Sequence, residues 1–292
     1  MSKEKKKKDK KVKKKKLSEE QLEKRYKKVA YAAGQEGIEV LLNELKDKTL
    51  EWEKISSNQD IKMYKRDIEG FKFPKLKLVS MVPMASPQEV YDLSWTMEGR
   101  KKWDEQLKTI EVMKTFPLEN ENEELFVVQF AMKPPMRTMS ARFQVDATLL
   151  RRTNDGKIIT GRQTVEDSKI GIDTTKIKGK KGITKPSGVL FTPITRKQWI
   201  KYAKKSKTTR TIKEGEDPDE IVATKLESII FPDIGKKPVK MLAKVMLKMM
   251  SKFMPKGFTT MIDFITTDYQ EEKKKKSKKS EKKKKKKPKN EK

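Results

Sequence analysis

The chain of 292 residues contains no cysteine and no histidine. Without them there can be no disulfide, no zinc site with thiolate or imidazole ligands, and no relay that pairs a nucleophile with histidine. No pair of carboxylates has a spacing that requires a reaction. We therefore expect a protein that is not an enzyme, with no catalytic residues, no metal site and no cofactor.

Long apolar segments are also missing. No run approaches the ~20 uncharged apolar residues that span a bilayer. The lysine-rich first residues lack the apolar centre of a signal peptide, and the absence of cysteine fits a reducing compartment. These features predict a cytoplasmic protein whose association with membranes is peripheral. We also expect a monomer.

Positive charge is abundant, and most of it lies in two tails. Of the net charge of +30, residues 1–17 carry +9 and residues 271–292 carry +10. Such runs repel themselves and bury little apolar surface, so both tails are predicted to be disordered. Polylysine binds polyanions, which makes an anionic membrane surface an expected partner. Binding of nucleic acid by the same tails stays open, as does a purely solubilising role.

Between the tails the pattern predicts helices at three places. Ser18 begins a helix that continues to about Leu45 and is loosened at Gly34 and Gly37. Ser86, followed by proline and then by Glu89, matches a capping box at a second helix. A short helix with one buried aromatic side chain, Trp103, follows it.

Alternation of apolar and polar residues predicts an antiparallel sheet. Strands are expected at residues 52–55, 61–68, 75–82, 109–116, 124–132, 140–150, 157–166, 188–191, 198–202 and 221–231. Residues 168–186 and 204–219 are expected to be loops. The chain is therefore predicted to be of the α+β class, with a large curved sheet. Its expected divisions are 1–17 (tail), 18–50 (helix), 51–270 (folded domain) and 271–292 (tail).

The last predicted helix lies within residues 233–265. Pro238 suits its first turn, and a stop or kink is expected at residues 255–257, before the helix resumes at Phe258. One apolar face and an opposite row of lysines give three interpretations: a core helix, a helix lying on a membrane, or a calmodulin-type target helix. The apolar face contains Leu242, Val245, Met246, Met249, Met250 and Phe253, and the lysines are Lys236, Lys240, Lys244, Lys248 and Lys252.

The order of elements and several short strings resemble the START lipid-transfer domains, the family related to steroidogenic acute regulatory protein. The strings are Ile61-Lys-Met-Tyr-Lys-Arg66, Pro87-Gln-Glu-Val-Tyr91, Arg100-Lys-Lys-Trp-Asp104, Pro135-Met136 with Met139-Ser-Ala-Arg142, and Thr224-Lys-Leu-Glu227 with Pro232-Asp-Ile-Gly235. The string at Arg100 is the most specific of them. The resemblance covers about residues 50–269, and residues 168–219 are longer and more basic than the family pattern.

The resemblance implies a helix-grip fold in which the terminal helix covers an apolar tunnel that holds one lipid. The residues expected to contact the lipid are Phe126, Val128, Phe130, Phe143, Val145, Val245, Met246, Met249, Met250 and Phe253. Arg142 and Arg162 would pair a phosphate if they point inward, and would be surface residues if they point outward. Lys240, Lys244, Lys248 and Lys252 are expected to contact membranes, whereas Trp103 and Asp104 are expected to be structural.

The identity of the lipid stays open among sterol, phosphatidylcholine, ceramide and fatty acid. A second hypothesis is a polyanion-binding protein, in which the lysine tails bind an acidic membrane or nucleic acid and the folded domain is incidental.

Overall fold

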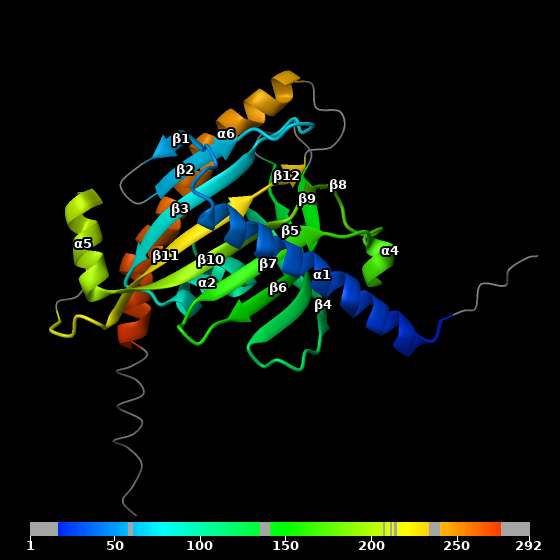
Figure 1. Cartoon of the computed structure of the whole chain (residues 1–292), viewed down its shortest axis with the longest axis horizontal. Coiled ribbons are helices and arrows are strands. Elements are labelled where there is room, and N and C mark those ends of the chain that lie inside the picture. Colours follow the sequence, from blue (N-terminus) through cyan, green and yellow to red (C-terminus); the bar gives the residue numbers. More distant parts are fainter. Residues whose placement is uncertain are drawn as a thin grey trace, which may run out of the picture.

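The computed structural model describes residues 17–57, 61–134, 141–206, 208–210, 212, 215–233 and 240–275. A large sheet forms the centre of this part of the chain, and helices cover both of its faces (Figure 1). The predicted disorder of the tails concerns residues that lie almost entirely outside the described ranges. The last helix, however, continues through residue 275, beyond the predicted domain end at residue 270.

The strands follow one another across the sheet in the order β1-β2-β3-β11-β10-β7-β6-β5-β4, and each neighbouring pair is antiparallel. This confirms the predicted antiparallel sheet. The strands are β1 (Glu53–Ser57), β2 (Ile61–Arg66), β3 (Lys75–Pro83), β4 (Leu107–Phe116), β5 (Glu123–Met132), β6 (Arg142–Arg152), β7 (Ile158–Thr164), β10 (Ser187–Thr195) and β11 (Ile221–Ile230).

The segment predicted as a loop at residues 168–186 contains short elements. These are α4 (Asp167–Ile170), β8 (Lys180–Lys181) and β9 (Ile183–Thr184). β8 pairs in parallel with β6, and β9 pairs with β12 (Pro232–Asp233), which lies just before the final helix. The β9–β12 pair therefore links this segment to the part of the chain that leads into the final helix.

Each face of the sheet has its own apolar core. α1 (Glu19–Lys46) crosses one face, where it buries Ala30, Ile38 and Leu41 against strand residues Leu125, Val127, Val145 and Leu149. The opposite face is covered by α2 (Pro87–Trp95), α3 (Met97–Arg100) and α6 (Lys240–Phe264). The core on this side includes Val90, Leu93, Phe191, Leu226, Met261 and Ile265. The sheet is thus buried on both sides.

The glycines of α1 allow the helix backbone to approach the sheet closely. A Cβ atom on Gly37 would lie 2.5 Å from the backbone N of Arg162, and one on Gly161 would lie 2.0 Å from the carbonyl O of Gly34. Both distances are far below any real Cβ contact. The prediction that Gly34 and Gly37 loosen α1 is therefore wrong. These glycines instead let the helix pack closely against β7.

The capping box predicted at Ser86 is present, and the predicted helix start at Ser18 has one as well. Ser18 Oγ accepts a hydrogen bond from Gln21 N at 3.2 Å, and Gln21 Oε1 accepts one from Ser18 N at 3.1 Å. Ser86 and Glu89 repeat this arrangement at the start of α2. Each reciprocal pair satisfies backbone N–H groups that the first helical turn leaves without partners.

The predicted strand at residues 198–202 is wrong, because this segment lies in α5 (Arg196–Ser206). Thr195 N donates to Gln198 Oε1 at 3.0 Å, and Gln198 N donates to Thr195 Oγ1 at 3.4 Å. This third reciprocal pair, on residues that give little apolar signal, starts a helix. Trp199 and Tyr202 then recur at helical spacing against a small core.

Of the stop or kink expected at residues 255–257, the stop is wrong. α6 continues through Pro255 and is followed by a π-helical turn, η1 (Ile265–Tyr269). Pro255 is buried, and Met254 and Phe258 on either side of it pack against the same core. Tertiary packing here outweighs the local preference of proline to end a helix. The predicted start at Pro238 lies outside the described residues.

Candidate ligand-binding cavity

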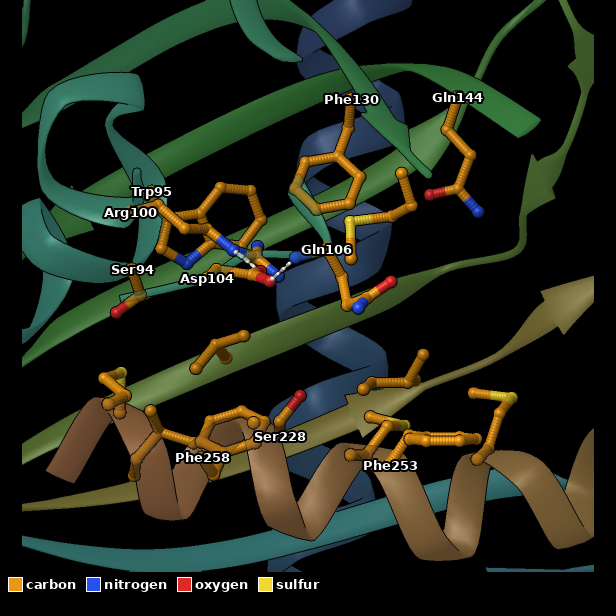
Figure 2. A pocket seen from close by; sticks show the side chains of 18 of the residues that line it. Ser94, Trp95, Arg100, Asp104, Gln106, Phe130, Gln144, Ser228, Phe253 and Phe258 are labelled. Carbon is orange, nitrogen blue, oxygen red and sulfur yellow. Dashed lines mark hydrogen bonds and ion pairs between the residues drawn. The ribbon is translucent and has the colours of Figure 1, made fainter. Parts of the chain in front are cut away.

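A cavity of about 440 Å³ lies between the sheet and α6. This volume is within the range of ligand-binding pockets, roughly 300–1,000 Å³. Figure 2 shows side chains from the sheet and from the α2–α3 region on one side, and α6 on the other. The lining residues are Ser94, Trp95, Arg100, Trp103, Asp104, Gln106, Phe130, Met132, Gln144, Arg162, Thr184, Val189, Phe191, Leu226, Ser228, Ile230, Pro232, Met250, Phe253, Met254, Gly257, Phe258 and Met261.

The wall formed by α6 is apolar. Apart from Gly257, the residues that it contributes are Met250, Phe253, Met254, Phe258 and Met261. The sheet adds Phe191, Leu226 and Ile230 from two neighbouring strands. Methionine side chains are flexible, so this wall can adapt to ligands of different shape. An apolar part of a ligand would face this side.

The opposite wall contains an ion pair between Arg100 and Asp104. Arg100 Nε lies 2.8 Å from Asp104 Oδ2, and the guanidinium lies over the ring of Phe130 at 4.6 Å. Burial lowers the pKa of Arg100, and the carboxylate of Asp104 opposes this effect. Trp103 fixes the same turn, because its indole Nε1 donates to the carbonyl O of Leu93 at 2.8 Å. Trp103 therefore holds this turn in place, and its side chain also lines the cavity.

Arg162 points into the cavity from β7. Its guanidinium lies over the ring of Trp95 at 5.0 Å and donates no hydrogen bond to any residue that the structure describes. Burial lowers its pKa, and Asp146 raises it. A guanidinium has five N–H donors, so donors that open into the cavity are available to a ligand.

Asp146 is the buried acidic group behind Arg162. It is 1% exposed and accepts a hydrogen bond from Thr164 Oγ1 at 2.5 Å, while its Oδ2 has no partner among the described residues. Burial raises the pKa of Asp146, and the charge of Arg162 reduces that rise. Arg162 and Asp146 thus form a polar cluster whose charge depends on the protonation of Asp146.

The structure brings some of the predicted site residues together. Phe130, Arg162, Met250 and Phe253 line the cavity, with Phe253 half exposed at its edge. Phe126 and Val128 lie in the core of the same sheet face without lining the cavity. Arg162 points inward, which is one of the two orientations that the sequence left open.

Other predicted residues lie elsewhere. Phe143 and Val145 pack on the opposite face, beneath α1. Residues paired directly across antiparallel strands share a face, and Phe130 pairs with Gln144 while Val128 pairs with Asp146. The β6 side chains on the cavity side of the sheet are therefore the polar residues Gln144, Asp146 and Thr148. The predicted residues, Phe143 and Val145, are offset from these by one position.

Several remaining predictions are outside the cavity or outside the described residues. Arg142 is partly exposed at the start of β6, beside β8, and does not line the cavity. Val245, which is 39% exposed, and Met249 do not line it either. The side chains of Lys240 and Met246 are not among those described. Residues 135–140, which include part of one quoted string, are also outside the described ranges.

Sequence reasoning missed Arg100, Gln106, Gln144, Asp146 and Ser228 as candidate site residues. The signal for β6 was present, because Gln144, Asp146 and Thr148 place polar side chains at every second position of a central strand. Such a row is unusual in a sheet covered on both sides. Arg100 and Asp104 were noticed only as part of a family string.

Two kinds of feature are absent from the described residues. They contain no group of three or more acidic side chains arranged to hold a metal ion. Within the same ranges, no helix has both the length and the apolar character needed to cross a membrane.

A curved antiparallel sheet that encloses a cavity beneath a long C-terminal helix defines the helix-grip class of folds. Within this class the chain belongs to the START domain family, whose model matches residues 35–193, just over half of the sequence. The match begins inside α1 and ends in β10.

Solved structures agree on the fold. Human StAR-related lipid transfer protein 5 has a TM-score of 0.56 and 18% sequence identity, over 82% of this chain and 94% of that protein's chain. Human STARD10 has a TM-score of 0.56 and 15% identity, over 82% of this chain and 81% of its own. No curated protein sequence matches the chain.

Proposed function

We propose that this protein binds one lipid molecule in the cavity and transfers or presents it at membranes, without catalysing a reaction. The observation that carries the proposal is the division of the cavity lining into two parts: α6 and neighbouring sheet residues form an apolar wall, and Arg100, Asp104 and Arg162 supply polar groups to the wall that faces it. An amphipathic ligand fits such a site, because it can bury its chain while its polar group meets fixed donors. The structures named above include a lipid transfer protein of the same fold.

The polar wall favours a lipid with an acidic polar group, such as a phosphate. The donors of Arg162 face the cavity without a partner among the described residues, whereas Arg100 is already paired with Asp104. Arginine binds phosphate in a bidentate manner, and such charge-assisted bonds are stronger than neutral ones. Asp146 would compete least for Arg162 when protonated, and its raised pKa favours that form.

Contact with membranes is assigned to exposed lysines. Lys244, Lys248 and Lys252 are exposed along α6, and the tails add most of the remaining excess charge. In this proposal residues 51–270 bind the lipid with the helix of residues 18–50 packed behind them, and the tails at 1–17 and 271–292 attract anionic surfaces. Peripheral association in the cytoplasm is part of the same proposal.

Native mass spectrometry of the purified chain tests the ligand proposal. We expect a population carrying one co-purified lipid, rich in acidic headgroups. Arg162→Gln should lower the acidic fraction by about tenfold, as the loss of one charge-assisted hydrogen-bonding group implies. Arg142→Gln is the matched control, because Arg142 lies outside the cavity lining. Protein without lipid, which also fails to take up lipid from vesicles, would contradict the proposal.

The second candidate, polyanion binding by the tails, rests on their charge. Salt separates the two functions. Binding of the lysine tails to RNA or acidic vesicles should fall steeply above about 0.5 M salt, where the Debye length is only a few ångströms. A lipid enclosed in the cavity should stay bound. If all binding disappears together, the polyanion hypothesis is favoured.

A further inference from the structure

The segment between β10 and β11 carries a basic surface that the cavity does not use. It is formed by Lys197, Ile200, Lys201, Lys204 and Lys205 of α5, here called the α5 surface. All five side chains are exposed, and Ile200 is 47% exposed. Positions 197, 200, 201 and 204 follow helical spacing and therefore lie on one side of the helix. The surface thus surrounds an exposed isoleucine with four cations.

The lysines of the α5 surface have no acidic partners among the described residues. None of the four forms an ion pair with any residue that the structure describes. Two of the nearby acidic groups have other contacts: Glu220 pairs with Arg196, and Asp217 accepts from Asp219 N at 2.9 Å. These acids lie at the N-terminal end of α5, where Lys197 N donates to the carbonyl O of Pro218. Lys201, Lys204 and Lys205 lie farther along the helix.

The inner side of α5 is firmly packed. Trp199 is 3% exposed and packs in a small core with Met81, Ile194 and Ala223. The segment is also joined to the final helix, because Arg210 Nη2 lies 2.7 Å from Asp263 Oδ1. Figure 1 shows α5 standing out beside the sheet. The α5 surface is therefore a fixed helical face, held at the end of the molecule where α6 leads into the C-terminal lysine tail.

We propose that the α5 surface binds anionic lipid bilayers. Its lysines would contact lipid phosphates while Ile200 enters the headgroup boundary, as in helices that lie in the membrane interface. The positive charge without protein partners identifies a polyanionic partner, and the central isoleucine favours a bilayer over nucleic acid. No arginine or aromatic side chain is exposed on this face, so it lacks the groups that stack on or read bases. The proposal adds a folded membrane contact to those already assigned to the tails and α6.

A single-cysteine label tests the proposal in the full-length chain, which has no native cysteine. Ile200→Cys, labelled with an environment-sensitive dye, should shift to shorter wavelength with phosphatidylserine-containing vesicles and not with phosphatidylcholine alone. Val112→Cys is the matched control: Val112 is 56% exposed on β4, the edge strand at the end of the sheet order. Equal shifts at both positions, or none at position 200, would overturn the proposal. A shift with RNA but not with vesicles would assign the surface to nucleic acid instead.

A charge variant gives an independent test. Replacing Lys201, Lys204 and Lys205 together by glutamine should lower the partition coefficient for acidic vesicles by at least about tenfold. Replacing Lys54, Lys62 and Lys108 by glutamine removes the same charge from exposed positions on β1, β2 and β4. This control variant should lower the partition coefficient much less. Equal losses in both variants would contradict a specific surface. The lipid adduct in native mass spectrometry should be unchanged in both, so failure here is distinct from failure of the cavity proposal.

Discussion

The two halves of α6 differ in how they are held. The C-terminal half buries Met261 and Ile262 completely, and η1 after it buries Ile265 to the same degree. The N-terminal half exposes Val245 and Phe253, and among its described side chains Leu247, Met250 and Met254 pack with a small cluster around Met63, Phe73 and Leu76, near the β1 end of the sheet. Both halves face the cavity. We expect the N-terminal half to leave the domain more easily, because it covers the smaller of the two apolar clusters.

Polar contacts add to this difference. Gln270 Nε2 donates to the carbonyl O of Met84 at 2.7 Å, and Tyr269 OH lies 3.3 Å from Glu89. Lys273 pairs with the same carboxylate, and Lys102 pairs with Glu272. The final helix is thus fixed at its C-terminal end to α2 and α3. Opening of the cavity should start at the end near residue 240, with the C-terminal half as the pivot.

Charge placed in each half should produce the largest contrast. Ile262→Asp puts an unpaired carboxylate in a full core and should lower the free energy of unfolding by roughly 4 kcal/mol or more. Phe253→Asp, at a half-exposed position, should cost about 1 kcal/mol or less, yet should strongly reduce lipid transfer. Urea denaturation and a vesicle transfer assay measure the two effects. Similar destabilisation by both variants would remove the distinction between the halves.

Hydrogen exchange should show the same contrast without mutation. Amides of the N-terminal half should exchange about 100-fold faster than those of residues 259–265, because local opening exposes little apolar surface there. Acidic vesicles should increase exchange in the N-terminal half only. Uniformly slow exchange along α6, with and without vesicles, would make the helix ordinary core and would contradict its role as a lid.

Glu89 tests the C-terminal attachment. It caps α2 and accepts from Tyr269 and Lys273, so Glu89→Gln should cost about 1–2 kcal/mol. Burial alone would raise the pKa of Glu89, but hydrogen bonds from Lys273 and Ser86 hold it below its usual value. Its stabilising effect should therefore be complete above the unfolded pKa of about 4.5 and be lost as pH falls through the lower folded value.

The measurement is the difference in unfolding free energy between wild type and Glu89→Gln from pH 7 down to pH 3. Gln88→Ala on the same helix is the control, because the hydrogen bonds of the Gln88 side chain are to Asp92 and Arg152, which lie outside the final helix. A difference that does not shrink on acidification would show that the carboxylate charge is not what holds this end.

Gly257 offers the smallest change. A Cβ atom there would meet no atom within 4 Å, although the residue lines the cavity. Gly257→Ala should stabilise the helix by roughly 0.5–1 kcal/mol through reduced backbone freedom. If bending near Gly257 helps the N-terminal half to move, lipid transfer should slow by a few-fold while ligand capacity stays the same. Faster or unchanged transfer would place the bend elsewhere.

The sequence predicted the frame of the domain better than its cavity. Period-two alternation located most strands, and the serines at positions 18 and 86 located two helix starts, because both signals are local. Alternation could not say which side of β6 faces the cavity, since both faces of the sheet are buried. Phe143 and Val145, the more apolar set, pack beneath α1, while the polar set around Asp146 faces the cavity.

Two other errors have similar physical causes. Trp199 and its neighbours suggested a strand because a five-residue segment is too short for its helical spacing to stand out. Pro255 suggested a helix end, and the packing of Met254 and Phe258, which no local pattern reports, carried the helix through it. The pairing of Arg100 with Asp104 follows from i,i+4 spacing, but only the fold places both in the cavity.

Because α1 crosses β7 closely, the shape of the cavity depends on a residue that does not line it. Gly37 lies against the backbone N of Arg162, on the face opposite the cavity. Any larger side chain at position 37 must move that strand, and the guanidinium on its far side moves with it. In a mutational scan scored by which lipid co-purifies, Gly37 should therefore behave like a contact residue. The lipid selectivity of such a domain can therefore change through substitutions on the face of the sheet opposite the cavity, as well as through substitutions in the cavity lining.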